Sequence, residues 1–284
     1  MAPQVLRTVD EVKAWVADLR RAGRRLALVP TMGYLHEGHL SLMREGRQRA
    51  DVVATSIFVN PTQFGPKEDL SRYPRDFEGD LARCASVGVD SVFAPELGAM
   101  YPPGYQTYVE VTEVSQGLCG DRRPGHFRGV ATIVTQLLAL FRPDVSLFGE
   151  KDYQQLQVIK ALNRDLHLGG EIIGMPTVRE PDGLAMSSRN AYLSPEERKR
   201  ALALSRGLGA AQALYRSGTA DASALVEVVR RELRAADLRE DYVELVDAER
   251  LKPVSSVQPG QPARLLVAAF CGTTRLIDNQ PIGG

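Results

Sequence analysis

The chain has 284 residues, of which 44% are hydrophobic and 25% are charged, and it contains 25 glycines and 17 prolines. This composition is typical of a globular protein rather than a disordered one, and the length suggests two domains. Lys plus Arg and Asp plus Glu both number 35, so the chain has no bulk positive charge that would attract a polyanion. We therefore do not expect a nucleic acid as partner.

The cysteines and the N-terminal residues indicate the cellular compartment in which we expect the protein. Cys84, Cys119 and Cys271 are widely spaced and form no CxxC pair, which argues against a disulfide framework or a zinc site. Residues 1–10 lack the apolar core of a signal peptide, and no stretch approaches the ~20 apolar residues that a membrane span needs. We expect a cytoplasmic protein with reduced thiols and no membrane association.

The first part of the chain alternates between helical and strand-like hydrophobic patterns. Thr8 and Glu11 have the spacing of a capping box and open a helix. The elements predicted after it are strands over 26–30, 51–60, 91–94, 145–148 and 171–176, and helices over 40–50, 77–87, 130–141 and 153–166. Because several strands are nearly continuous in apolar character, they suit a buried parallel sheet with right-handed crossovers.

The pattern changes after Val178. Ser194 with Pro195 and Glu197 has the form of a helix N-cap, a proline at the first helical position and a capping-box glutamate. The elements predicted in this part are helices over 194–218 and 222–235 and strands over 242–246 and 264–270.

Together these patterns predict an α/β fold with two domains. Residues 1–177 form a Rossmann-like, doubly wound parallel sheet, and residues 178–284 form a smaller α+β domain. A Pro-Asp-Gly turn at 181–183 makes residues 178–190 a plausible hinge.

Residues 30–40, Pro-Thr-Met-Gly-Tyr-Leu-His-Glu-Gly-His-Leu, lie between a predicted strand and a predicted helix. A helix N-terminus favours an anion, and His36 and His39 can add hydrogen-bond donors on the same side. Gly38 between them allows the backbone to approach a phosphate closely. A lone histidine would more often be an incidental loop residue, but the strand directly before this pair favours phosphate binding. Their spacing does not fit the His-Glu-x-x-His zinc motif.

Two further segments carry groups suited to phosphates. Residues 186–189, Met-Ser-Ser-Arg, supply two hydroxyls and the Arg189 guanidinium, although a polar loop that caps the next helix would have a similar sequence. Residues 149–152, Gly-Glu-Lys-Asp, follow a strand and precede a helix, so Lys151 can reach a phosphate oxygen.

Other polar residues are weaker candidates. Gln63 ends a predicted strand and offers a donor and an acceptor to a carboxylate or hydroxyl substrate, or else satisfies its own turn. Asp80 is a candidate for a carboxylate near Mg²⁺, although it could equally be an ordinary acidic residue on the surface. His126 could belong to a lid and His167 to a helix end, and we expect neither to be catalytic. Residues 207–209, Gly-Leu-Gly, lie inside a predicted helix and no P-loop occurs, which excludes dinucleotide-dependent hydride transfer and P-loop hydrolysis.

The two main segments resemble the HxGH and KMSKS-type signatures of the nucleotidyltransferase superfamily. Ala185 and Ser188 stand where KMSKS has lysines, and this departure is expected of the family named next. Over nearly its whole length the chain resembles the pantothenate synthetase (pantoate:β-alanine ligase) family, and the segments that carry this resemblance, in order, are 30–40, 57–65, 125–129, 147–155 and 186–193.

The resemblance implies ATP-dependent condensation of (R)-pantoate with β-alanine through a pantoyl adenylate, with Mg²⁺, releasing AMP and pyrophosphate. It also implies a homodimer and a C-terminal domain that closes over ATP. The implied ATP-site residues are Pro30, Met32, Gly33, Tyr34, Leu35, His36, Glu37, Gly38, His39, Gly149, Glu150, Lys151, Asp152, Val178, Met186, Ser187, Ser188 and Arg189.

Roles follow from the same resemblance. His36, His39, Lys151 and Arg189 are the expected catalytic residues, with His39 in the position that the family labels a proton donor. Gln63 and Gln155 are expected to bind pantoate, and Gln63 also β-alanine. Because pantoate's carboxylate is already ionised near neutral pH, the first step needs positioning and charge neutralisation more than a base.

Three alternatives stay open at the level of sequence. Another nucleotidyltransferase would retain the nucleotide in its product, whereas a ligase of this kind releases AMP. A nucleotide-binding regulatory module would be favoured by a broken histidine pair, which is not seen. An aminoacyl-tRNA synthetase fragment would need an RNA-binding surface, and the balanced charge argues against one.

Overall fold

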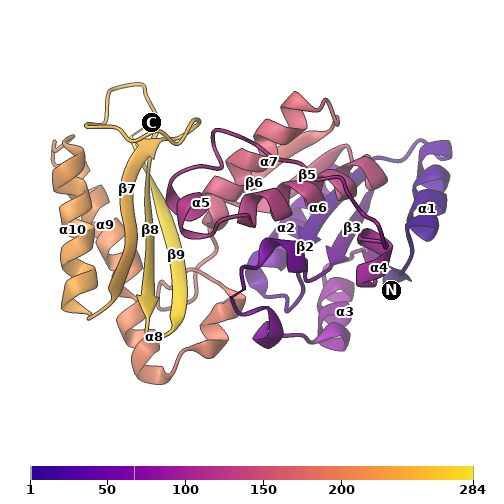
Figure 1. Ribbon diagram of the computed structural model, residues 1–284, viewed down its shortest axis with the longest axis horizontal. Coiled ribbons are helices and arrows are strands. Elements are labelled where there is room, and N and C mark those ends of the chain that lie inside the picture. The colour runs from indigo at the N-terminus through magenta and orange to yellow at the C-terminus, as the bar shows by residue number, and fades with distance from the viewer. Residues whose placement is uncertain (1, 67, 284) are drawn as a thin grey trace. The chain divides into compact units, whose positions relative to one another are not determined.

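The computed structural model describes residues 2–66 and 68–283, and the chain divides into two compact units. The N-terminal unit comprises residues up to Glu150 together with Gln155–Pro176, and the C-terminal unit comprises Lys151–Gln154 together with Thr177–Gly284 (Figure 1). Each unit has its own sheet and its own hydrophobic core.

The described residues of the N-terminal unit form a parallel sheet in the order β1-β4-β3-β2-β5-β6. Its strands are β1 (Gln4–Leu6), β2 (Leu26–Thr31), β3 (Val52–Ile57), β4 (Ser91–Phe93), β5 (Val145–Gly149) and β6 (Glu171–Met175). The chain runs outward from β2 to β4 on one side and then returns to place β5 against the other side of β2. This reversal is the topological switch point at which doubly wound sheets bind their ligands. The predicted fold class is confirmed, and the short edge strand β1 is an addition to it.

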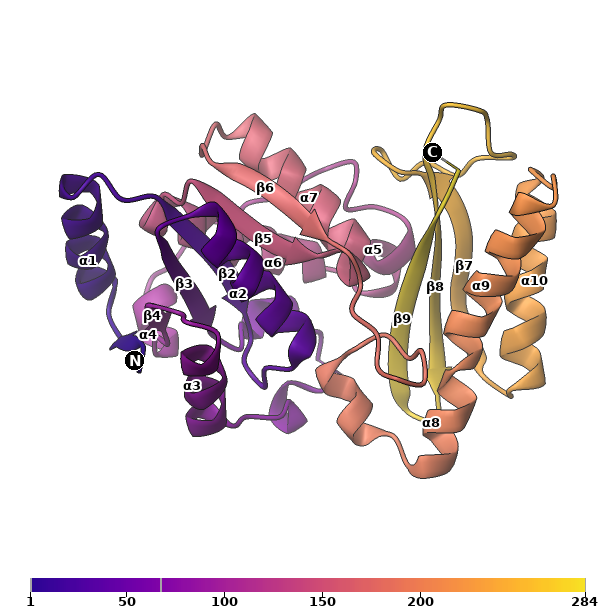
Figure 2. The same ribbon diagram turned by 180° about the vertical axis from the view of Figure 1, so that it is seen from behind.

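Helices cover both faces of this sheet. The longer ones are α1 (Val9–Arg21), α2 (Glu37–Arg49), α3 (Phe77–Ser86), α6 (His126–Phe141) and α7 (Tyr153–Asp165), and the short ones are α4 (Leu97–Met100) and α5 (Leu118–Arg122). On one face Phe141 of α6 packs edge-on against Phe93 of β4 and Trp15 of α1, with ring centroids 5.8 and 6.4 Å away. On the other face α2 and α3 share a buried cluster with β2 and β4. Figure 2 shows α2 lying across the strands on that second face.

The C-terminal unit is an antiparallel sheet backed by helices. Its elements are α8 (Pro195–Ala201), α9 (Ala203–Arg216), α10 (Ala222–Ala235), β7 (Arg239–Asp247), β8 (Ala263–Cys271) and β9 (Thr274–Ile282), with strand order β7-β8-β9. Leucines and valines of α9 and α10 fill a core with those of β7 and β8. At Gly207 a Cβ atom would lie 3.1 Å from the Val229 Cα, so the two helices approach closely where a glycine allows it.

Several predicted boundaries need correction. The helix predicted over 194–218 is two helices that meet at Leu202, although the predicted capping box of Ser194 and Glu197 is present. Strand β9 was not predicted at all. Short 3₁₀ helices occur at Pro61–Gln63, Leu70–Arg72, Glu150–Asp152 and Ser188–Tyr192. Within the described ranges, none of the helices has both the length and the apolar character needed to cross a membrane.

Candidate active site

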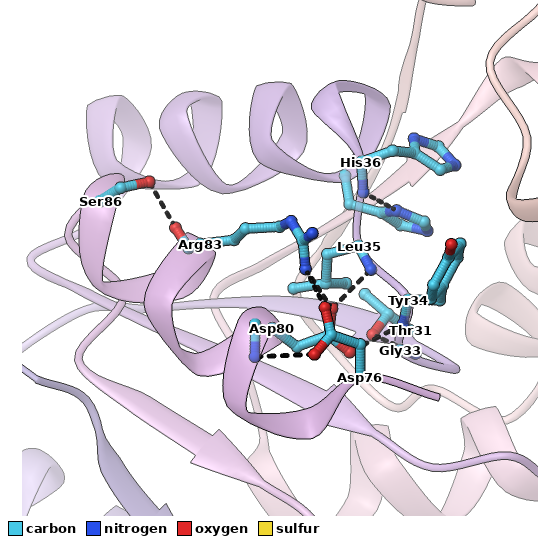
Figure 3. Close-up of polar contacts among 11 residues, drawn as sticks. Thr31, Gly33, Tyr34, Leu35, His36, Asp76, Asp80, Arg83 and Ser86 are labelled. Atoms are coloured by element: carbon cyan, nitrogen blue, oxygen red, sulfur yellow. Dashed lines mark hydrogen bonds and ion pairs between the residues drawn. The ribbon is translucent and has the colours of Figure 1, made fainter. Parts of the chain in front are cut away.

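The loop that joins β2 to α2 lies at the switch point, and a buried carboxylate holds its backbone. Asp80 of α3 accepts the backbone N–H of Tyr34 at Oδ2 and that of Leu35 at Oδ1, both at 2.7 Å (Figure 3). Gly33 has φ +84°, and a Cβ there would lie 2.9 Å from Ile57 Cγ2 and 3.0 Å from Asp80 Oδ2. Glycine is therefore required at position 33 for both reasons, and the loop has one well-defined path.

Asp80 is 1% exposed, so the alternative of an ordinary surface acid is wrong. Burial raises the pKa of the Asp80 carboxyl, and the two N–H groups from the loop offset only part of that effect. Since both carboxylate oxygens already accept these N–H groups, the geometry points to a structural anchor, and a role in metal binding stays a prediction. In the described ranges no three His, Cys, Asp or Glu side chains gather where they could hold a metal ion.

The two histidines stand at the start of α2, as predicted. His36 is the N-cap residue and His39 lies in the first turn, and their ring centroids are 4.1 Å apart with planes inclined by 40°. The backbone N–H of His36 donates to His39 Nδ1 at 3.2 Å. Because that nitrogen accepts, the neutral ring carries its proton on Nε2, the nitrogen that can then donate to an anion. Helix dipole and histidine donor thus act at the same helix end.

Gln63 lies in the 3₁₀ helix that follows β3 and is 8% exposed. Its Nε2 donates to the Met32 sulfur at 3.2 Å, and its Oε1 accepts from Asn60 Nδ2 at 3.1 Å. A Cβ at Gly129 would lie 2.4 Å from the Thr62 carbonyl oxygen, so helix α6 presses directly on this turn. The structure therefore brings Gln63 together with Met32 of the β2 loop, while its amide is also partly satisfied by its own turn, as the alternative predicted.

His126 has a role that sequence reasoning missed. It is 7% exposed, and its Nδ1 donates to the Gln63 carbonyl oxygen at 2.8 Å while its Nε2 accepts from Arg123 Nη1 at 3.0 Å. A carbonyl oxygen only accepts and a guanidinium only donates, so the imidazole is held in one neutral tautomer. Rather than serving a lid, His126 fixes the backbone of the turn that carries Gln63. The glycines at 125 and 129 on either side of it were the only sequence signal.

Arg123 is itself held by a carboxylate. Its Nε and Nη2 donate to Glu68 Oε1 and Oε2 at 2.8 and 2.7 Å, the bidentate geometry that favours Arg–carboxylate pairs. Burial alone would raise the pKa of Glu68, but the hydrogen bonds and charge of Arg123, together with smaller effects such as the backbone hydrogen bond at Gly65, more than offset it, so that pKa lies below its ordinary value. Glu68, Arg123 and His126 thus form a chain of contacts that ends at Gln63.

Gln155 lies in the first turns of α7, which follows β5. Since β5 neighbours β2 in the sheet, this half-buried amide belongs to the same strand-end edge as the β2 loop. Gly149 ends β5 and Glu150 follows it, so these two predicted ATP-site residues lie at that edge of the N-terminal unit as well.

The remaining predicted residues belong to the C-terminal unit. Lys151 has an 18% exposed side chain whose Nζ lies 3.6 Å from Asp152 Oδ2. The segment that carries Met186 folds back on Val178, with the Met186 N–H donating to the Val178 carbonyl at 3.0 Å. Ser187 then caps the 3₁₀ helix of Ser188–Tyr192 by accepting the Arg189 N–H at 3.3 Å. The segment from Val178 to Arg189 is therefore an ordered hairpin.

A parallel sheet whose switch-point loop carries His36, Gly38 and His39 at a helix N-terminus defines a Rossmann-like nucleotide-binding protein. Residues 4–281 match the family model described as pantoate-beta-alanine ligase. The chain belongs to this family, which confirms the predicted resemblance.

Named relatives and solved structures agree with this membership. The chain is 79% identical to a pantothenate synthetase of Myxococcus xanthus (strain DK1622), over 100% of this chain and 98% of the relative. It resembles the crystal structure of pantothenate synthetase from Thermus thermophilus with 44% identity and a TM-score of 0.93, over 99% and 100% of the two chains. A pantoate-beta-alanine ligase from Francisella tularensis, complexed with beta-gamma ATP and beta-alanine, has 32% identity and a TM-score of 0.83, over 98% and 97%.

Proposed function

We propose that this protein joins (R)-pantoate to β-alanine at the expense of ATP, through a pantoyl adenylate, and releases AMP and pyrophosphate. The family match over residues 4–281 carries the ligase activity. The histidine pair at the N-terminus of α2 is the observation that favours a phosphate-transfer step at this site.

In the first step a pantoate carboxylate oxygen attacks the α-phosphorus of ATP. A carbon–oxygen–phosphorus link forms, and the bond from the α-phosphorus to pyrophosphate breaks. Gln63 and Gln155 hold pantoate at the strand-end edge, while the N-terminus of α2 and His39 Nε2–H stabilise the charge that builds on the phosphates. His39 acts here mainly as a preorganised hydrogen-bond donor, because its neutral tautomer is set by the His36 backbone.

In the second step the amine of β-alanine attacks the acyl carbon and AMP leaves with the oxygen that came from pantoate. Gln63 also contacts β-alanine in this proposal. The amine has a pKa of about 10 and must lose a proton before or during attack. In this proposal that proton passes to the phosphate of the bound adenylate or to solvent.

Lys151, Arg189 and the serines at 187 and 188 supply charge and donors to the triphosphate. Ammonium and guanidinium groups suit phosphate oxygens, the latter as a bidentate partner. The C-terminal unit, which carries these residues, serves as the part that closes over ATP, and the functional boundary lies near residues 177 and 178.

Magnesium enters this account with its nucleotide. Mg²⁺ is usually held through substrate phosphates and one or two carboxylates, and it keeps several waters. The described residues offer no ready protein cage for it, and both oxygens of Asp80 already accept backbone N–H groups. In this proposal Mg²⁺ binds together with ATP, mainly through phosphate oxygens, and the metal-side role of Asp80 stays a prediction.

Assembly and location complete the proposal. The family resemblance is what supports a further proposal, that the protein forms a homodimer. It acts in the cytoplasm, where its three buried thiols, at Cys84, Cys119 and Cys271, remain reduced. Sedimentation of the wild type tests the dimer, and a monomer at all concentrations would contradict it.

The reaction is tested by incubating the purified protein with MgATP and pantoate, with and without β-alanine. Sustained release of AMP that requires both substrates, with pyrophosphate formed in equal amount, is the expected result. If folded protein that binds ATP releases no AMP under either condition, or retains the nucleotide in its product, the proposed reaction is wrong.

A further inference from the structure

Strand β9 carries two adjacent buried polar residues, Asp278 and Asn279, each 3% exposed. Successive side chains of a strand point to opposite faces, so burial of both is unusual for a sheet with helices on one face. Buried polar groups cost free energy unless they are hydrogen-bonded. Their partners therefore indicate what these two residues do.

Asp278 holds the start of the hairpin that carries the Met-Ser-Ser-Arg segment. Its Oδ2 and Oδ1 accept from Arg179 Nη1 and Nη2 at 2.7 and 3.0 Å. The backbone N–H of Asn279 also donates to Asp278 Oδ1, at 2.7 Å. One carboxylate thus joins β9 to the residue directly after Val178.

Asn279 reaches in the other direction, to the segment that carries Lys151. Its Nδ2 donates to the Lys151 carbonyl oxygen at 2.9 Å, and its Oδ1 accepts from Arg264 Nε at 2.6 Å. Because a guanidinium can only donate, Arg264 fixes which end of the amide faces Lys151.

Two further contacts hold the same segment. The Arg264 guanidinium stacks on the Tyr153 ring at 4.1 Å, and the Tyr153 hydroxyl donates to the Ala248 carbonyl at 2.8 Å. Residues Lys151–Gln154 are therefore part of the C-terminal unit through specific polar contacts, although the helix that begins at Tyr153 continues into the other unit.

We propose that Asn279 is a positioning residue for Lys151: by holding the Lys151 carbonyl, with its own amide oriented by Arg264, it sets where the Lys151 side chain starts. The inference rests on the proposed role of Lys151 at the phosphates of ATP. A small displacement of a charged donor at a reacting group is costly, since a misplacement of 1 Å can reduce a rate by about 10²-fold.

Asn279→Asp is the informative substitution. It keeps the size of the side chain and its acceptor toward Arg264, but it replaces the donor at the Lys151 carbonyl with a second acceptor. Pantoate-dependent exchange of pyrophosphate into ATP, which reports adenylate formation alone, should fall about tenfold or more in kcat. The KM for pantoate should stay unchanged, because Gln63 and Gln155 belong to the other unit.

Asn163→Asp is the matched control. Asn163 Nδ2 also donates to a backbone carbonyl, that of Gly170, at 3.1 Å, so the same chemical change is made at a contact of the same kind. Asn163 lies in α7, and Gly170 is not among the proposed site residues. The Asn163→Asp variant should exchange pyrophosphate into ATP at a rate within about twofold of the wild type, because substitutions away from the site usually have small effects.

The decisive readout is the double variant with Lys151→Ala. If Asn279 acts through Lys151, adding Asn279→Asp to Lys151→Ala should reduce exchange no further, since coupled residues are not additive. Multiplied losses, or normal exchange in Asn279→Asp alone, would overturn the inference while leaving the proposed reaction intact. Normal exchange in Lys151→Ala would instead remove the proposed role of Lys151, and the inference with it. Should Asn279→Asp fail to fold, Asn279→Ser takes its place in the same cycle, because a serine is too short to donate to the Lys151 carbonyl.

Discussion

Gly129 offers a test in which sequence and structure predict opposite signs. Replacing an exposed glycine in a helix by alanine usually stabilises the helix by about 1 kcal/mol. At Gly129, however, the added Cβ would lie 2.4 Å from the Thr62 carbonyl oxygen and 2.6 Å from the Gln63 nitrogen. Ordinary carbon contacts need about 3.5 Å, so helix α6 and the turn at Gln63 must separate by roughly 1 Å.

The expected cost follows from that separation. Overpacking of a close contact typically costs about 1–3 kcal/mol, which cancels or exceeds the gain in helix propensity. A shift of about 1 Å in Gln63 should also lower kcat/KM for pantoate by about 10²-fold. Urea unfolding measures the first effect, and AMP release at limiting pantoate measures the second. The KM for ATP should change little, because the β2 loop keeps its Asp80 anchor.

Gly209→Ala is the control, since it too is a helical glycine but nothing lies within 4 Å of its Cβ position. It should raise the free energy of unfolding by up to about 1 kcal/mol and leave activity unchanged. If Gly129→Ala is as stable as Gly209→Ala and keeps its kcat/KM for pantoate, the close approach of α6 to the Gln63 turn does not matter, and the reasoning is refuted.

Three further predictions concern single contacts. Asp80→Asn places an amide NH₂ against one of two backbone donors, so the free energy of unfolding should fall by about 1–3 kcal/mol and the KM for ATP should rise; unchanged urea midpoint and KM would contradict the anchoring role. His39→Ala and Lys151→Ala should each lower pyrophosphate exchange by about 10²-fold with circular dichroism unaltered, and near-normal exchange in either would refute its assigned role. Because the pKa of Glu68 is lowered in the folded state, its ion pair with Arg123 contributes stability that is fully present above pH 4.5 and is lost as the pH falls below that value. In urea titrations from pH 6 to 3, Glu68→Gln should therefore lie below the wild type at pH 6 and approach it at pH 3, whereas a constant difference would show that the pair does not titrate as inferred.

Local signals in the sequence were sufficient for much of the fold. The capping box at Thr8 and Glu11 involves residues three apart, and it is present with hydrogen bonds of 3.0 and 3.2 Å. The apolar runs of β2 and β3 are equally local, since burial on both faces favours hydrophobic residues at most positions.

What was missed depends on partners far away in the chain. Strand β1 has three residues and exists because it pairs with β4, about ninety residues later. Strand β9 was hidden because Asp278 and Asn279 interrupt its apolar pattern, and their hydrogen bonds with Arg179, Arg264 and Lys151 account for their burial. A sequence pattern cannot show such partners.

In the candidate site, too, the residues recognised from their sequence neighbours differ from those whose partners lie far away in the chain. The place of His36 and His39 at a helix start after a strand was predicted from adjacent residues and is confirmed. Asp80 acts on a loop 45 residues earlier, and His126 acts on a carbonyl 63 residues earlier, so neither role could be derived from spacing. The sequence thus indicated the groups that face the ligand better than those that hold them in place.

The central claim is that an oxygen of pantoate becomes bonded to the α-phosphorus of ATP. Pantoate labelled with ¹⁸O in its carboxylate, together with MgATP and β-alanine, tests it directly when the products are analysed by mass spectrometry. The account predicts one ¹⁸O atom in each AMP formed and none in pyrophosphate. Unlabelled AMP, or label in pyrophosphate or inorganic phosphate, would contradict an acyl adenylate and with it the proposed mechanism.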